Sequence, residues 1–497
     1  MKYNIVIIGL FLSFSFIGCS DEKLDLPPED SLSSATFFQS QKDFEQGING
    51  AYAPLRDLYN DPNDDFAGAW AMGELRSDNT HYKFNPNYRA LVYVEQIADF
   101  MVNDANVVLE NKYINNYLII ARANQVLSSI DNVEFDQSVK NNIKGQANFL
   151  RALAYFDLVQ YFGEIPLHLE PVQDREEAAL PLTSVEEIYN QIISDSQLAI
   201  ELLPLKSQQQ PGRATRGAAQ MLLSNAYIVN KNWDGAVEVL SSLVESGEYG
   251  LLGNYEAVFN LENENSIESI FEVHYIEGTE GLASSFFYEW IPMPLNASQV
   301  AEITGVPNSQ AATFEGFNIP APDLINAYED GDLREEASIA YFNLDGEEFP
   351  YIDKFNNPHS IPGLTGTNWP VYRYSEALLF YAEALTEAGD LGMAETYLNQ
   401  VRSRAGLDPI NGLDQNQLKD AIIKERRFEL AFENKRWLDL VRTERAVEVM
   451  TNYGQKVKSN PENYYYPEGI APPPSAYSEI KLLFPKPASE SLLNPNF

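Results

Sequence analysis

The chain has 497 residues, of which 44% are hydrophobic and 21% are charged, which suffices for one large domain or two to three ordinary ones. Its formal charge is −38 at pH 7. Such a surface repels the phosphates of nucleic acids and anionic lipid headgroups, so neither is expected as a direct ligand. The single cysteine excludes an intramolecular disulfide and a cysteine-based metal site.

The first nineteen residues have the pattern of a membrane-targeting segment. Lys2 is followed by an apolar run, 5–17, which is shorter than the ~20 residues that span a bilayer but suits a signal peptide. The run ends at Gly18-Cys19 and resembles a bacterial lipobox, with Phe16 where leucine is usual. We expect residues 1–18 to be removed and Cys19 to carry the lipid that anchors the protein. The alternative is an ordinary secretory signal followed by an incidental cysteine.

Helical periodicity dominates the remainder of the chain. Helix-rich stretches are predicted at 104–131, 139–162, 184–203, 214–229, 233–246, 371–388, 391–405 and 415–450. Ser184 and Glu187 form a capping box, and Asp414 to Gln417 is a looser version. The runs 226–236 and 384–394 both contain small residues around a polar turn, which favours stacked helix pairs of the tetratricopeptide kind.

Irregular segments interrupt this helical pattern. We expect one domain over 19–497, in which a helical scaffold at about 104–246 and 371–450 carries loop-rich excursions at about 60–93 and 250–370. Within the second excursion, residues 270–276 suggest a strand, and residues 340–355 suggest a hairpin around Asp345-Gly346. Residues 451–497 contain eight prolines and little periodicity. Loops this long inside a compact domain are usually functional.

Three helical runs and the tail resemble the SusD/RagB family. The runs are 145–152 with 161–167, 373–384 and 425–440, followed by Leu483-Phe484-Pro485-Lys486-Pro487 and Asn494-Pro495. Gln146 stands where the family usually has glutamate, and Asn434 where it usually has glycine. Asparagine tolerates left-handed backbone geometry, so we expect the turn at Asn434 to survive.

The resemblance implies a mainly α-helical, tetratricopeptide-like scaffold with an irregular ligand-binding face and minor β-hairpins. It also implies a lipoprotein on the outside of the outer membrane that binds glycans without catalysis. Its implied partner is a SusC-like TonB-dependent transporter, to which it would deliver the ligand. The acidic pair that follows Cys19, Asp21-Glu22, looks like the export signal of such surface lipoproteins.

Motifs of known enzyme classes are missing from the sequence. The four histidines are scattered, and no His-Glu-x-x-His, Gly-x-Ser-x-Gly or phosphate-binding glycine loop occurs. Residues 61–65 begin like a calcium loop, but Phe66 and Met72 occupy the positions that need glycine and glutamate. We therefore expect no metal and no cofactor. The charged run 425–442 has the spacing of ion pairs between helical turns, which favours a structural role.

Aromatic residues are the better candidates for a sugar site, because a sugar's C–H face lies flat on an indole or phenol ring. Trp233 and Trp437 lie in helix-pair patterns and are expected in the core. The loop-rich segments supply the candidate carbohydrate-binding residues, namely Trp70, Arg76, Asp78, Asn79, Tyr82, Tyr88, Tyr288, Trp290 and Trp369. Segments 66–93 and 279–294 carry almost no net positive charge, so we expect a neutral or weakly charged oligosaccharide.

Two other functions remain open from the sequence. A RagB-like relative would capture peptides on the same fold, and an α-helical glycoside hydrolase would need only two carboxyl groups ~5–9.5 Å apart, which 72 acidic residues could supply.

Overall fold

The computed structural model describes residues 37–60, 68, 70–87, 89, 92–312, 316–344 and 346–497. The expected signal segment, Cys19, the calcium-like loop at 61–65 and Tyr88 lie outside these residues. In the described part of the chain, no helix is long and apolar enough to cross a membrane.

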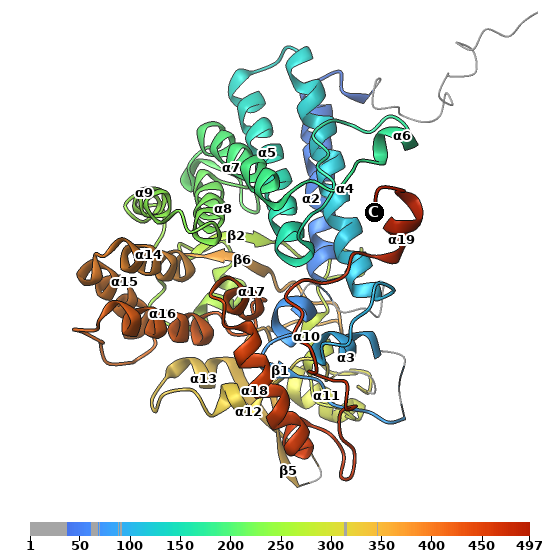
Figure 1. The fold of residues 1–497 in the computed structure, drawn as a ribbon, viewed down its shortest axis with the longest axis vertical. Helices are drawn as coiled ribbons and strands as arrows, with labels where there is room; N and C mark the ends of the chain where they lie inside the picture. Colours follow the sequence, from blue (N-terminus) through green and yellow to red (C-terminus); the bar gives the residue numbers. More distant parts are fainter. Residues whose placement is uncertain are drawn as a thin grey trace, which may run out of the picture.

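Nine helices of the described chain pack one against the next and form the scaffold (Figure 1). They are α2 (Gln41–Tyr59), α4 (Val107–Ser129), α5 (Gln137–Phe162), α7 (Val185–Leu202), α8 (Arg216–Val229), α9 (Trp233–Val244), α14 (Tyr374–Ala388), α15 (Leu391–Arg404) and α16 (Gln415–Glu429). Helix α9 packs directly on α14, although a long excursion separates them in the sequence. The predicted mainly helical, tetratricopeptide-like architecture is confirmed.

The local signals in the sequence explain where these helices begin and how closely they approach. The Ser184–Glu187 capping box starts α7, and the Asp414–Gln417 box starts α16. At the turn before α9, the side chain of Asn232 accepts a hydrogen bond from the backbone N of Gly235. Asp390 makes the equivalent cap before α15. Four alanines from the two similar runs are completely buried, which lets the helix pairs meet closely: Ala226, Ala236, Ala384 and Ala394.

The stretch 415–450, predicted to be helix-rich, is divided into separate helices. After α16 come two further helices, α17 (Arg436–Arg442) and α18 (Ala446–Ser459). The breaks fall at residues with positive φ, namely Phe432 at 69° and Glu444 at 61°. Asn434 has φ 63°, so the expectation that asparagine keeps the left-handed turn is confirmed.

The described residues form three short antiparallel strand pairs. Strand β2 (Ser269–Val273), predicted from the sequence, pairs with β6 (Trp369–Arg373) near the centre of the molecule (Figure 1). The start of the helix expected at 371 is therefore strand. The predicted hairpin is confirmed as β4 (Ile339–Leu344) and β5 (Glu347–Ile352), and β1 (Thr80–His81) pairs with β3 (Ile319–Pro320).

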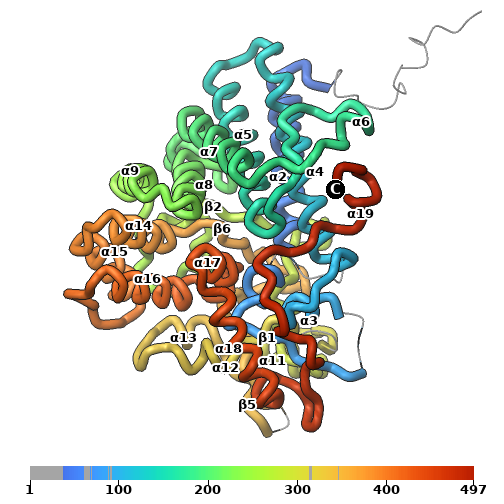
Figure 2. The backbone as a smooth tube through the Cα atoms, in the orientation of Figure 1, coloured from blue at the N-terminus to red at the C-terminus, as the bar shows by residue number. Residues whose placement is uncertain are grey.

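Helix α2 and several short helices were not anticipated. The short ones are α3 (Val92–Ala98), α6 (Arg175–Ala178), α10 (Phe286–Trp290), α11 (Ala297–Thr304), α12 (Pro322–Ile325), α13 (Leu333–Ser338), α19 (Ala488–Leu493) and the π-helical turn η2 (Ala71–Leu75). The tail then returns over the first helices (Figure 2), where the backbone N of Phe484 donates to Tyr161 O and the side chain of Asn494 donates to Leu180 O.

Candidate functional site

The two loop segments expected to bind ligand meet in the structure. The backbone N of Lys83 donates to Gly316 O over 2.9 Å, and the backbone N of Gly316 donates to Glu289 O over 2.9 Å. The Lys83 ammonium also donates to Met293 O at 2.6 Å. Segment 70–87 and the segments 285–312 and 316–317, which are far from it in the sequence, therefore form one loop region.

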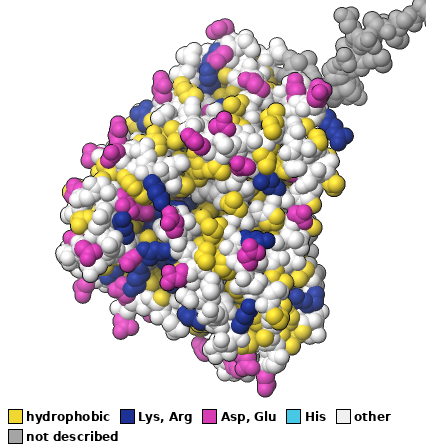
Figure 3. All heavy atoms as spheres, viewed as in Figure 1, with side chains coloured by type: hydrophobic (Ala, Val, Ile, Leu, Met, Phe, Trp, Pro, Cys, Tyr) yellow, Lys and Arg dark blue, Asp and Glu magenta, His cyan; other side chains and the backbone are white. Residues whose placement is uncertain are grey.

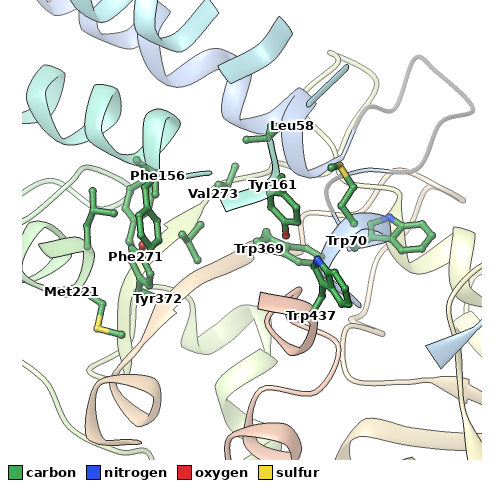
Figure 4. Close-up of a cluster of buried hydrophobic side chains, with 14 of the residues drawn as sticks. Leu58, Trp70, Phe156, Tyr161, Met221, Phe271, Val273, Trp369, Tyr372 and Trp437 are labelled. Carbon is green, nitrogen blue, oxygen red and sulfur yellow. The ribbon is translucent and has the colours of Figure 1, made fainter. Parts of the chain in front are cut away.

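The three loop tryptophans form the buried centre of this region. The ring of Trp290 lies 5.6 Å from that of Trp70 and 6.2 Å from that of Trp369. Phe286 and Phe355 pack between them, and the three indoles are at most 1% exposed. Figure 4 shows Trp70 and Trp369 among the buried side chains. This placement corrects the expectation of an exposed platform, because each ring contributes more by closing the core than by facing water.

Four polar candidates of segment 66–93 are also buried and bound to protein groups. Arg76, Asp78, Asn79 and Tyr82 are each at most 6% exposed. The Arg76 guanidinium donates to Lys481 O at 2.8 Å, and the Tyr82 hydroxyl donates to Asp99 Oδ2 at 2.9 Å. These contacts hold the loop region together, so the expectation that these side chains face a ligand is corrected in the same way.

Asp78 and Asn79 attach the loop region to the last helices of the scaffold. Asp78 pairs with Arg427 at 2.9 Å and with Arg436 at 2.8 Å. Burial alone would raise the pKa of the Asp78 carboxyl, but the two guanidinium groups hold that pKa well below its usual range. The side chain of Asn79 donates to Glu74 Oε1 and accepts from Arg427 Nε.

Tyr288 is the candidate that keeps access to solvent, since its side chain is only half-buried. Its hydroxyl lies 2.6 Å from His359 Nε2, and the two rings meet edge to face with centroids 5.5 Å apart. Partial burial raises the pKa of the Tyr288 hydroxyl, which therefore stays protonated and can donate a hydrogen bond at neutral pH.

A row of accessible rings that sequence reasoning missed lies beside Lys83. We call Phe84, Phe349 and Tyr465 the outer aromatic row, and all three are half-buried. The Phe349 and Tyr465 rings are 5.2 Å apart, and the Lys83 ammonium lies 4.5 Å from the Phe349 ring. The backbone N of Phe84 donates to Tyr465 O. The run Tyr464-Tyr465-Tyr466 in the proline-rich tail was the available signal for this row.

The charged run 425–442 takes part in a buried ion network rather than an active site. Arg373 contacts Glu268 and Glu429 at 3.0 Å and Glu433 at 2.7 Å. Glu429 also pairs with Arg404, and its pKa is held below the usual range because these guanidinium groups outweigh the effect of burial. The structural role expected for the run is confirmed, but most pairs join separate elements rather than turns of one helix.

The charges on the accessible surface are mixed. Figure 3 shows acidic side chains scattered over the helical part of the visible face, with basic ones between them. No group of three or more side chains suited to a metal ion occurs among the described residues.

The comparisons with known proteins agree over most of the chain. The family model described as "SusD family" matches residues 346–497, and the one described as "Starch-binding associating with outer membrane" matches residues 24–228. SusD-like protein P2 of Formosa agariphila is 29% identical over 100% of this chain and 98% of its own length. The chain belongs to the SusD family.

Solved structures show the same fold. A SusD homolog from Bacteroides thetaiotaomicron superposes with a TM-score of 0.77 at 20% identity, covering 93% of this chain and 97% of that one. A laminarin-binding SusD-like protein superposes with a TM-score of 0.74 at 25% identity, covering 92% and 98%. As a SusD-like protein, the chain is a glycan-binding protein of the cell surface rather than an enzyme.

Membership of the SusD family also gives the ion network a context. Two of the runs that carry the resemblance, 373–384 and 425–440, supply Arg373, Glu429 and Glu433 to that network. In this SusD-like chain, two of the runs that resemble the family therefore contribute side chains that hold the scaffold together.

Proposed function

We propose that this SusD-like chain is an outer-membrane lipoprotein, anchored through Cys19 and facing the exterior, that captures a neutral or weakly charged oligosaccharide. The ligand would then pass to a SusC-like TonB-dependent transporter. The observation that carries the proposal is the loop region itself, where segments distant in the sequence meet and leave Tyr288 and the outer aromatic row accessible.

These residues have the chemistry that a neutral sugar needs. Phenyl and phenol rings offer flat apolar faces to the C–H face of a pyranose, while hydroxyl and imidazole groups bond its hydroxyls. Tyr288 supplies a phenol ring and its hydroxyl, and His359 supplies an imidazole whose Nε2 lies 2.6 Å from that hydroxyl. Of the residues proposed from the sequence, we therefore retain Tyr288 as a direct contact with the ligand. The buried candidates pack beneath the accessible residues and hold them in place.

Binding is tested by isothermal titration of the purified chain with two neutral hexasaccharides. Maltohexaose is chosen because a matching family model is described as starch-binding, and laminarihexaose because a structural relative binds laminarin. We expect heat of binding with at least one probe and no release of reducing ends. If the chain binds peptides and neither oligosaccharide, the proposal is wrong and RagB-like peptide capture takes its place.

The anchor and the partner are tested in membranes. Wild-type chain should sediment with outer membranes and co-purify with a TonB-dependent barrel after solubilisation in detergent. The Cys19→Ala variant should leave the membrane in cells that lack the barrel. A variant that still fractionates with the outer membrane in those cells would refute the lipid anchor.

A further inference from the structure

A two-lobed groove lies away from the outer aromatic row, between α2 and β2. Its lobes have volumes of about 380 and 270 Å³ and share the lining residues 211–213, Phe271 and Glu272. Gly212, with φ 77°, lies so close to the His274 ring that an added Cβ would come within 2.7 Å of it. The wall is therefore closely packed at this point.

Two arginines line the smaller lobe, and neither has a carboxylate partner among the residues that the structure describes. Arg213 donates to the side-chain oxygen of Asn49 and lies 5.0 Å from the Tyr52 ring. Arg56, from the last turn of α2, lines the same lobe. Over the described ranges, neither arginine forms an ion pair, whereas Arg373 in the buried network contacts three carboxylates.

A lysine lines the larger lobe. The Lys206 ammonium donates to the backbone carbonyls of Ser266 and Ser269. Burial lowers its pKa to about 8, and the carboxylates of Glu272 and Glu248 partly offset that effect. The lysine is thus mainly protonated at pH 7, so three cations face one groove, one from α2 and two from the loop between α7 and α8.

Two carboxylates in the walls oppose these cations. Glu248 accepts hydrogen bonds from the backbone N and the hydroxyl of Ser207, at 2.7 and 2.9 Å. Glu272 accepts from the side chain of Asn368 at 3.0 Å and from the backbone N of Asn265 at 3.3 Å. The smaller lobe is left with two guanidinium groups against one carboxylate, a local positive excess in a chain whose formal charge is −38.

We propose that this groove is a second ligand site, which binds the carboxylate or sulfate group of an acidic sugar unit. Guanidinium groups bind planar and tetrahedral oxyanions through paired N–H donors. The acidic remainder of the protein repels anions at long range, but salt screens that repulsion beyond a Debye length of about 8 Å. The proposal goes beyond capture of a neutral glycan, since it concerns different residues and a ligand group that carries negative charge.

One short segment connects the groove to the proposed glycan face. After His274, the hydroxyl of Tyr275 donates to Arg56 O at 2.9 Å. Two residues later, the Glu277 carboxylate accepts from the backbone N of Ser360, the neighbour of His359. Residues 274–277 therefore join the wall of the groove to the neighbourhood of His359.

The test is isothermal titration of the full chain with trigalacturonate, glucose 6-sulfate and maltotriose at low salt. We expect an anionic probe to bind at least tenfold more tightly than maltotriose and to weaken as salt is added. The Arg56→Gln, Arg213→Gln double variant should lose at least tenfold in affinity for that probe. The matched control is Arg175→Gln, an exposed arginine on α6, which should bind as the wild type does.

A gain-of-affinity variant keeps the test decisive if the double variant unfolds. Glu272→Gln removes the opposing charge at nearly constant shape and should tighten binding of the anionic probe severalfold. Unchanged or weaker binding by Glu272→Gln, equal binding of the anionic probes and maltotriose, or an unaffected, folded double variant would each overturn the proposal.

Comparison of the two anionic probes distinguishes a carboxylate from a sulfate ligand. Tyr288→Ala should leave anion binding unchanged, so failure of the glycan face and failure of the groove are separable.

Discussion

The scaffold and the loop region both bury large polar and aromatic side chains, but they do so in different ways. In the scaffold, Arg373 is enclosed by three carboxylates, which come from the end of α16, the turn after it and the turn before β2. In the loop region, indoles fill the interior, whereas Tyr288 and the outer aromatic row remain accessible. The comparison shows that an aromatic residue in a loop can be fully buried. The accessible rings of a site can instead be tyrosines and phenylalanines that no sequence motif marks.

The largest loss of stability is expected from breaking the ion network. Arg373→Met would leave three carboxylates without their central cation, and removal of one partner from a buried pair costs roughly 3–5 kcal/mol. Chemical denaturation should show a loss at or above the upper end of that range. The control is Lys231→Met, which removes a solvent-exposed pair with Glu444 and should leave the stability nearly unchanged. Equal losses would contradict a structural role for the network.

Trp290→Ala should reduce the stability of the loop region rather than remove a sugar contact. Truncating a buried tryptophan costs roughly 3–5 kcal/mol, because the lost apolar contacts leave a cavity. Thermal unfolding measures the loss. Trp290→Phe, which keeps a ring in the core, should be milder and should retain wild-type affinity for the hexasaccharide probe. Wild-type stability of Trp290→Ala would place this indole outside the core.

Two buried acids should respond to pH in opposite directions. The pKa of Asp439 is lowered to about 2, since Arg426 and Arg442 outweigh burial. Its stabilising effect is present above pH ~4, the unfolded value, and is lost as the pH falls towards 2; its size is roughly 2 kcal/mol. Burial raises the pKa of Glu74 to about 7, despite hydrogen bonds from Asn79 and the backbone.

The pH dependence that Glu74 contributes is therefore opposite to that of Asp439. Stability should fall as the pH rises from about 4 through 7. Glu74→Gln should remove that loss and be relatively more stable at pH 8 than at pH 5. Asp439→Asn should instead remove the loss on acidification. Denaturation curves at pH 3, 5 and 8 measure both effects, and the same pH response in both variants would contradict these assignments.

The smallest effect is expected at a helix cap of the scaffold. Ser184→Ala removes the hydroxyl that accepts from the backbone N of Glu187, so α7 should lose about 1 kcal/mol. A shift in the denaturation midpoint without a change in slope would confirm it. A loss comparable to that of Arg373→Met would show that the cap has a larger structural role.

The sequence predicted the scaffold well because helix periodicity and caps are local signals. Strand β6 was missed because its residues lead directly into α14, and its pairing with β2 joins positions about a hundred residues apart. The same limit applies to the sites. No local pattern distinguishes buried Trp290 from accessible Tyr288, and the groove takes Arg56 and Arg213 from segments that only the fold brings together.

The central claim is that accessible rings, rather than the loop tryptophans, hold the glycan, and variant titration tests it most directly. With whichever hexasaccharide binds wild type, Tyr288→Ala and Tyr465→Ala should each weaken binding about tenfold, the loss of a stacking contact of ~1–2 kcal/mol. Tyr397→Ala, a half-buried tyrosine on the scaffold, should bind as wild type does. Unchanged affinity in both ring variants, together with a loss in folded Trp290→Phe, would contradict the claim.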